Sequence, residues 1–176
     1  FKKIAKKNSI DFYLREKKYA TSNTKSDTVV YDFIQNINCK YIVWLNPIAP
    51  LQTEEEVSKI IEYFLENKLN SLITVYPKKV HSLYKNKPLN FSLNEKFAKT
   101  QDLIPINEMV YSVMMWNSQS FIKQMKKKNY AMLHGKVSYF PVNYKSSILL
   151  KNIDDLKVIS SYLIKKKKEK IKYYKI

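Results

Sequence analysis

The sequence predicts an α/β fold in which a mostly parallel sheet is flanked by helices. Short apolar runs rich in β-forming residues alternate along the chain with segments whose apolar residues have helical spacing. The links between them are short, which is typical of strand–helix–strand units. Several runs, such as 41–45 (YIVWL), are continuously apolar, as expected for strands that are buried on both faces of a parallel sheet.

The individual elements follow from this alternation. Strands are predicted at 10–14, 41–45, 71–75, 110–116, 136–142 and 147–150. Helices are predicted at the start of the chain, over 26–37, after Thr53, over 118–127 and from Ile153 onward. The helix after Thr53 has the clearest start, because Thr53 and Glu56 have capping-box spacing and three consecutive glutamates suit a helix N-terminus.

Residues 77–110 interrupt the alternation. They are rich in Pro, Lys, Asn and Ser, with isolated apolar residues, and the stretch is too long for an ordinary connection. We therefore predict a projecting arm at about 77–110 within one domain over 1–164. Residues 165–176 form a separate basic tail with seven lysines and one glutamate.

Composition excludes several classes of protein. At 45% hydrophobic the 176 residues can build a core, so wholesale disorder is excluded. The single cysteine, Cys39, excludes an internal disulfide framework and a cysteine-based zinc site, and it fits a cytoplasmic location. The single glycine, Gly135, excludes both the G-x-G-x-x-G motif and a Walker-type phosphate loop.

The formal net charge of +17 leaves two interpretations open. A lysine-rich tail with interleaved tyrosines can bind nucleic acid or an anionic membrane surface. Alternatively, the tail is a solvated helix end, where lysine suits the helix dipole. All basic residues except Arg15 are lysines, and lysine cannot bind a phosphate in the bidentate way that arginine does. The second interpretation is therefore favoured. No apolar run is long enough to span a bilayer.

Five segments resemble motifs of the acylneuraminate (sialic acid) cytidylyltransferases and occur in the family's order. The clearest is Leu45–Thr53 (LNPIAPLQT), which is similar to the family's L-Q-P-T-S-P-L-R-T loop. Four further segments resemble motifs of the family. Residues 15–26 resemble the family's R-P-x-x-L-A-x-D segment and the Ser that follows it, and residues 70–75 resemble its D-S-x-I-S-V strand. Residues 99–103 resemble the family's R-R-Q-D-L, and residues 147–156 lie where the family has S-I-D-I-D-x-x-x-D-L.

The resemblance implies a three-layer Rossmann-like nucleotidyltransferase fold whose arm packs on a second subunit, giving a homodimer. It also implies an enzyme that transfers CMP from CTP to an acidic nonulosonic sugar such as sialic acid, with Mg²⁺ and release of pyrophosphate. The expected partners are therefore CTP and an acidic sugar. No membrane partner is expected, and nucleic acid is not favoured.

The resemblance also assigns site residues by position. Nucleotide binding falls to Arg15 and Ser26, and sugar binding to Asn46, Pro47, Lys99 and Gln101. The Asn46 amide can donate to and accept from sugar hydroxyls, and Lys99 offers a point charge for a carboxylate. The alternatives are an ordinary strand-to-helix turn at Asn46 and Pro47, and a solvated lysine at Lys99.

Two departures from the family pattern affect catalysis. The glycine-rich N-terminal loop that grips the triphosphate is not in the sequence, and the chain opens with Phe1, so we expect a fragment and assign no catalytic residue. The family's two metal-binding aspartates correspond to Leu149 and Lys151, which supply no oxygen ligand for Mg²⁺. Lys151 could replace part of the metal's charge. Asp154 and Asp155 are expected to favour the start of the last helix rather than a metal.

Three functions remain open from the sequence. The first is a fragment of a cytidylyltransferase for an acidic sugar. The second is a non-catalytic relative that binds nucleotide or sugar, motivated by Leu149 and Lys151. The third, motivated only by charge and the tail tyrosines, is a basic nucleic-acid-binding domain. His81 and His134 are too few for a His-rich metal site, and no Ser/His/Asp arrangement has support in the sequence.

Overall fold

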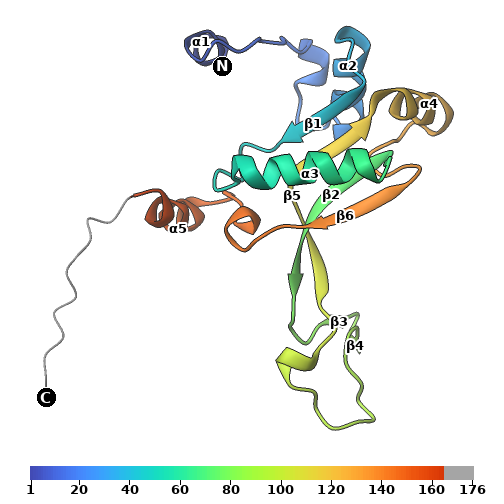
Figure 1. Ribbon diagram of the computed structural model, residues 1–176, viewed down its shortest axis with the longest axis vertical. Helices are drawn as coiled ribbons and strands as arrows, with labels where there is room; N and C mark the ends of the chain where they lie inside the picture. Colours follow the sequence, from blue (N-terminus) through green and yellow to red (C-terminus); the bar gives the residue numbers. More distant parts are fainter. Residues whose placement is uncertain (165–176) are drawn as a thin grey trace, which may run out of the picture. The chain divides into compact units, whose positions relative to one another are not determined.

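The structure is a computed structural model that describes residues 1–164, and its centre is a four-stranded sheet of order β1-β5-β2-β6 (Figure 1). The four strands are β1 (Tyr41–Leu45), β2 (Ser71–Lys78), β5 (Ile106–Asn117) and β6 (Val137–Pro141). A separate antiparallel pair consists of β3 (Leu83–Tyr84) and β4 (Lys87–Pro88). The predicted basic tail, 165–176, lies outside the described residues.

Residues 1–164 also form five α-helices. They are α1 (Lys2–Lys7), α2 (Ser26–Asn36), α3 (Glu54–Glu66), α4 (Ser118–Lys128) and α5 (Ile153–Leu163). Short 3₁₀ turns occur at Lys17–Tyr19, Thr100–Asp102 and Lys145–Ser147. The predicted α/β class, a sheet flanked by helices, is confirmed. Within residues 1–164, no helix has the length and apolar character needed to cross a membrane.

The sheet is mixed because β5 runs opposite to β1. The backbone N–H of Asn46 donates to the carbonyl of Ser112 at 2.9 Å, and that of Ser118 donates to the carbonyl of Lys40 at 3.0 Å. Residue numbers therefore rise along one strand as they fall along the other, which is antiparallel pairing. At the other side of the sheet, bonds of 2.9 Å run from Asn70 N to Lys136 O and from Val142 N to Val75 O. Both numbers rise together there, so β2 and β6 are parallel.

Two of the predicted strands, 10–14 and 147–150, do not form. Residues 10–14 join no sheet, and both Ile10 and Leu14 are exposed. Phe12, Tyr13 and Leu14 line a surface pocket instead. Ser147 ends a 3₁₀ turn, residues 148–150 lead from it toward α5, and the N–H of Leu150 donates to the carbonyl of Ile48 at 2.7 Å. The apolar β-forming residues of these two segments predicted strands, but their composition alone does not tell a strand from a loop that is held by such contacts.

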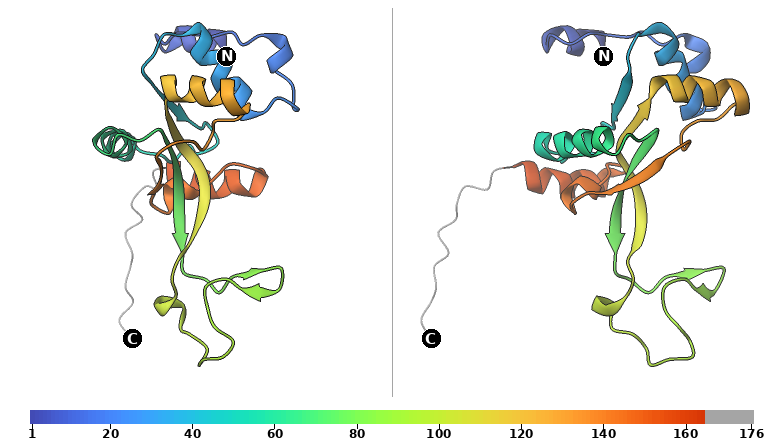
Figure 2. Two further views of the ribbon diagram at one scale, coloured as in Figure 1. Left: turned by 90° about the vertical axis from the view of Figure 1, so that its right-hand side faces the viewer. Right: turned by 45° about the vertical axis from the view of Figure 1, so that its right-hand side comes forward.

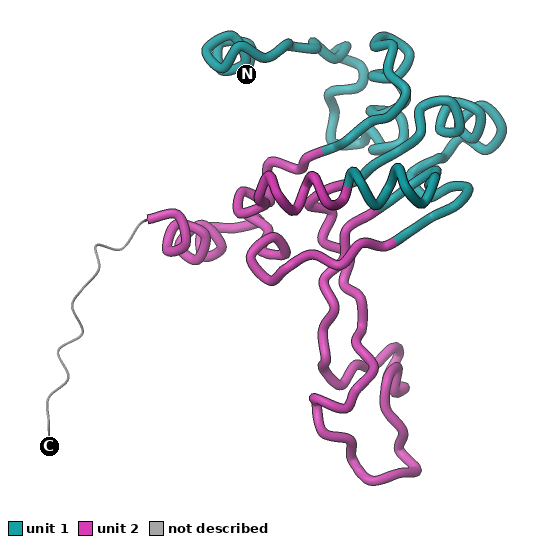
Figure 3. The backbone as a smooth tube through the Cα atoms, in the orientation of Figure 1, with its two compact units in different colours: residues 1–44, 61–72, 114–138 teal, residues 45–60, 73–113, 139–176 magenta. Residues whose placement is uncertain are grey.

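The chain divides into two compact units (Figure 3). Unit 1 contains residues 1–44, 61–72 and 114–138, and unit 2 contains residues 45–60, 73–113 and 139 onward. The core of unit 1 is centred on Trp116, which is fully buried and makes edge-to-face contacts with Trp44 and Phe121 at ring-centroid distances of 6.2 and 5.8 Å. Its indole N–H donates to the carbonyl of Met132 at 2.8 Å, so this large ring is buried without an unpaired polar atom.

Unit 2 contains the segment predicted as an arm. β2 and β5 run side by side toward the β3–β4 pair, as both views of Figure 2 show. Lys78 pairs with Glu108 at 2.5 Å where the two strands leave the sheet. Farther out, the Asn90 side-chain amide donates to the carbonyls of Val80 and Ile104, both at 2.9 Å. The arm exposes several large apolar side chains, namely Leu83, Tyr84, Leu89, Leu93, Phe97 and Ile104.

Candidate functional site

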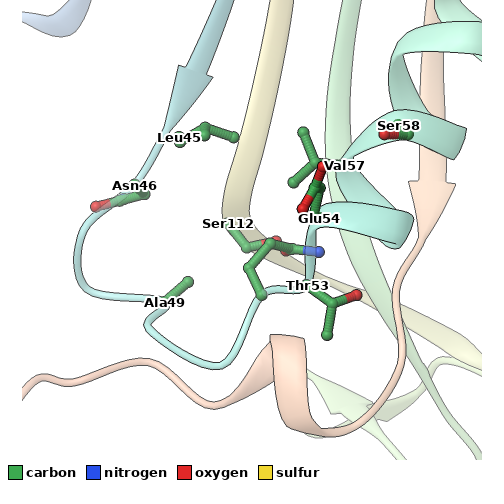
Figure 4. Close-up of a pocket in the computed structure, with 9 residues that line it drawn as sticks. Leu45, Asn46, Ala49, Thr53, Glu54, Val57, Ser58 and Ser112 are labelled. Carbon is green, nitrogen blue, oxygen red and sulfur yellow. The ribbon is translucent and has the colours of Figure 1, made fainter. Parts of the chain in front are cut away.

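Unit 2 has a pocket of about 380 Å³ at the loop that follows β1 (Figure 4). β1 ends at Leu45, and residues 46–53, the proline loop, connect it to α3. Loops at the carboxyl ends of strands are where α/β folds bind ligands. The pocket is lined by the proline loop, the first turns of α3 and one residue of β5: Leu45, Asn46, Ala49, Gln52, Thr53, Glu54, Val57, Ser58 and Ser112.

Asn46 shapes the first turn of the proline loop. Its Oδ1 accepts the N–H of Ile48 at 3.3 Å, and its backbone carbonyl accepts the N–H of Ala49 at 3.0 Å. Its own N–H donates to Ser112 of β5 at 2.9 Å, which holds the loop against the sheet. The strand-to-helix turn that we weighed as an alternative role for Asn46 is therefore present. The residue also lines the pocket, and its role in sugar binding stays a prediction.

The pocket combines an apolar part with hydroxyl and amide groups. Leu45, Ala49 and Val57 supply the apolar part, and the polar atoms come from Ser, Thr, Asn and Gln side chains and from the carboxylate of Glu54. Among residues 1–164, no Lys, Arg or His lines it. Such a lining suits a compact, hydroxyl-rich ligand, because hydroxyl and amide groups both donate and accept.

Glu56 organises this end of unit 2, and the sequence pointed only to its helix-capping role. Thr53 Oγ1 accepts the N–H of Glu56 at 3.3 Å, which is half of the predicted capping box. The Glu56 carboxylate does not reach back to the helix start. It accepts from the Asn143 backbone N–H at 2.8 Å, from Asn143 Nδ2 at 2.9 Å, and from Gln52 Nε2 and Ser146 Oγ. Glu56 therefore ties the proline loop to the turn before α5.

The structure brings the 149–151 segment next to the proline loop. The 2.7 Å bond from Leu150 N to Ile48 O joins the two directly. The resemblance assigned Asn46 and Pro47 to the sugar and placed Leu149 and Lys151 at the metal positions, without predicting that the two segments are in contact. Pro47 itself is exposed and is not among the residues that line the pocket.

Lys99 and Gln101 lie on the arm. Lys99 is exposed and precedes the 3₁₀ turn Thr100–Asp102. The carbonyl of Gln101 accepts from Lys79 Nζ at 2.5 Å, and its side chain is exposed. Neither residue lines the pocket at the proline loop. A role for them in sugar binding stays a prediction.

Arg15 and Ser26 lie in unit 1. Arg15 is exposed and borders a largely aromatic pocket of about 390 Å³ that also contains Phe12, Tyr13 and Phe33. Ser26 is the exposed first residue of α2 and does not border that pocket. The two predicted nucleotide-binding residues are therefore not gathered into one pocket of unit 1.

The donor set at the family's metal positions does not fit Mg²⁺. Leu149 has no ligand atom and Lys151 has only an ammonium group, whereas Mg²⁺ requires oxygen ligands in near-octahedral geometry. Asp155 Oδ2 accepts the N–H groups of Lys151 and Asn152 at 2.8 and 2.9 Å, and Asp154 pairs with Lys157 at 2.8 Å. Among residues 1–164, no group of three or more His, Cys, Asp or Glu could hold a metal ion. Asp154 and Asp155 serve the start of α5, as predicted.

A serine–histidine contact in unit 1 was not predicted. Ser120 Oγ lies 2.8 Å from His134 Nε2, and His134 Nδ1 lies 2.6 Å from the carbonyl of Ala131. Nδ1 must carry a proton to donate to the carbonyl of Ala131, and the single proton of the Ser120 hydroxyl is shared between Nε2 and the carbonyl of Asn117, which lies 3.0 Å away. Burial lowers the pKa of His134, partly offset by the bond to Ala131. The pair lines no pocket described for unit 1, so we assign it to structure.

Comparison with solved structures identifies the fold. The structure is similar to the crystal structure of 4-diphosphocytidyl-2C-methyl-D-erythritol synthase from Anaerococcus prevotii, with a TM-score of 0.59 and 14% sequence identity over 92% of this chain and 76% of that chain. No family model matches the sequence, and no curated protein matches it. At this identity the likeness concerns the fold alone, and it does not single out the acylneuraminate enzymes. The chain has a nucleotidyltransferase-like α/β fold.

Proposed function

We propose that this chain belongs to a cytidylyltransferase that transfers CMP from CTP to a sugar acceptor, and that unit 2 binds the acceptor. The main support is the pocket at the proline loop, which lies at the end of β1 in a nucleotidyltransferase-like fold. The similar solved structure is that of a protein named for a diphosphocytidyl product. The proline loop itself is the segment with the clearest resemblance to the acylneuraminate cytidylyltransferases.

An acidic nonulosonic sugar is the acceptor that we propose, on the strength of that resemblance. The hydroxyl and amide groups around the pocket suit the uncharged part of such a sugar. No cationic side chain of the described part of the chain lines the pocket, so the sugar carboxylate needs a positive charge from elsewhere. Lys99 on the arm is the candidate from the sequence.

A second candidate is a relative that binds nucleotide or sugar without turnover. Leu149 and Lys151 favour it, because the described residues provide no fit for the Mg²⁺ that the family uses. The two candidates share their ligands and differ in chemistry. They are therefore separated by measuring binding and product release on the same samples.

For the enzyme, we expect pyrophosphate release only when CTP and an acceptor from a panel of nonulosonic acids are both present. Calorimetry should show that both ligands bind. Binding without release would support the second candidate, and absence of binding by CTP and by every sugar would contradict both.

The pocket itself is tested by Ser58→Ala, which removes a pocket hydroxyl and should weaken sugar binding by about threefold to tenfold, the effect of one hydrogen bond. Ser22→Ala, an exposed serine of unit 1, is the matched control and should have no effect.

We also propose that the arm mediates a homodimer. The exposed apolar side chains on the arm support this, because burying them against a second copy is favourable. Leu93, 75% exposed, is a suitable probe, and Leu93→Glu should shift the protein from dimer to monomer in sedimentation equilibrium. Leu14→Glu is the control, since Leu14 is 78% exposed but lies in unit 1. A wild-type monomer, or equal effects of both variants, would contradict this proposal.

A further inference from the structure

The segment 149–151 lies beside the proline loop and carries the positive charge of Lys151. The hydrogen bond from Leu150 N to Ile48 O joins this segment directly to the proline loop, which lines the pocket. The side chain of Lys151 is exposed, and no ion pair involves it among residues 1–164. The ammonium group is therefore available to a ligand at this end of unit 2.

The carboxylates nearest in sequence to Lys151 are already used. Asp155 accepts two backbone N–H groups through one oxygen, and so completes the capping box of α5 with Asn152. Asp154 pairs with Lys157. These contacts explain why α5 begins where it does. A divalent cation needs several oxygen ligands that converge on one point, and Asp154 and Asp155 are not arranged in this way.

The glutamates at the start of α3 are not a substitute. Glu55 pairs with Lys59 at 2.5 Å, and this contact lowers the pKa of Glu55. Glu56 is engaged by Gln52, Asn143 and Ser146. Only Glu54 remains at the pocket, and one monodentate or bidentate carboxylate does not make a magnesium site.

We infer that this end of unit 2 binds the anionic phosphate group of its ligand without a divalent cation, with the ammonium group of Lys151 providing the positive charge. The inference rests on the proposed function for the identity of the ligand as a nucleotide. An ammonium group is a point charge with three donors, so it can neutralise and orient a phosphate oxygen. It carries half the charge of Mg²⁺ and cannot coordinate several phosphate oxygens at once.

Inorganic pyrophosphate is the probe that tests the inference independently of CTP. Calorimetry on the full chain should show binding in EDTA that is at least as tight as in Mg²⁺, because Mg²⁺ complexes free pyrophosphate and takes up part of its charge. Lys151→Ala should weaken binding in EDTA by about threefold to tenfold, as expected for a charge-assisted hydrogen bond. Lys157→Ala is the matched control and should have no effect, because Asp154 already balances that lysine.

Three results would overturn the inference: no pyrophosphate binding in EDTA, no effect of Lys151→Ala, or an equal effect of Lys157→Ala.

A second measurement follows the metal directly. Substoichiometric Mn²⁺ should not selectively broaden the amide NMR signals of residues 149–152 in the wild type, but should do so in the double variant Leu149→Asp/Lys151→Asp. Selective broadening in the wild type would also overturn it. Pyrophosphate binding without CTP binding would contradict the proposed function and leave this inference standing.

Discussion

Replacing Gly135 with alanine is expected to lower the free energy of unfolding by about 2–3 kcal/mol. Gly135 has a backbone φ of +61°, which costs about 1–2 kcal/mol for a residue with a β-carbon. That carbon would lie 2.3 Å from Asn70 Oδ1, closer than any real contact. Asn70 Oδ1 accepts the N–H of Lys136 at 2.8 Å, so moving Asn70 away breaks a bond worth about 1 kcal/mol.

Urea denaturation of three variants separates the two contributions. Asn70→Ala alone should cost about 1 kcal/mol, the value of the lost hydrogen bond. Adding Gly135→Ala to Asn70→Ala should then cost the backbone strain and the remaining contact with the β-carbon of residue 70, 2.8 Å away, but not the hydrogen bond a second time. A full, additive cost of Gly135→Ala in that background would show that it does not act through the Asn70 hydrogen bond.

The sequence predicted the elements whose causes are local. The run 41–45 is a strand and the Thr53–Glu56 spacing marks the start of α3, since apolar periodicity and capping depend on residues a few positions apart. The segments 10–14 and 147–150 have the same local composition as strands. Their structure is decided by distant partners, for example the carbonyl of Ile48 for Leu150, which a local pattern does not contain.

The candidate site shows the same division. Asn46 was predicted from a motif, and it lines the pocket. Glu56 and the Ser120–His134 contact were missed in their tertiary roles, because Asn143 is 87 positions from Glu56 and the serine gives no sequence pattern with its histidine. In the sequence, Gly135 served only to exclude glycine-rich phosphate-binding loops, because it is the single glycine. Its structural role depends on Asn70, 65 positions earlier, and no spacing rule links the two.

Glu56→Ala should be the most damaging change at the candidate site. The half-buried carboxylate accepts from both nitrogens of Asn143, from Ser146 and from Gln52. Its removal leaves these donors without their charged acceptor, and each hydrogen bond to a charged group contributes about 1.5–3 kcal/mol. Water can replace part of these bonds because Glu56 is only half-buried, so we expect a net loss of about 2–3 kcal/mol in the free energy of unfolding.

Hydrogen exchange locates the effect of Glu56→Ala. The amides of Asn143 and Ser146 should lose protection, because Asn143 N–H donates directly to Glu56 and Ser146 N–H donates to the Asn143 Oδ1 that Glu56 holds in place. Glu55→Ala is the matched control, one residue away in the same first turn of α3. It should leave these amides protected, since within residues 1–164 its carboxylate pairs with Lys59 alone. Equal loss of protection in the two variants would mean that helix N-terminal charge, rather than the Glu56 contacts, holds the turn before α5.

If the Glu56 contacts hold this turn, Glu56→Ala should also weaken ligand binding. The reason is that the turn leads directly into the 149–151 segment beside the proline loop.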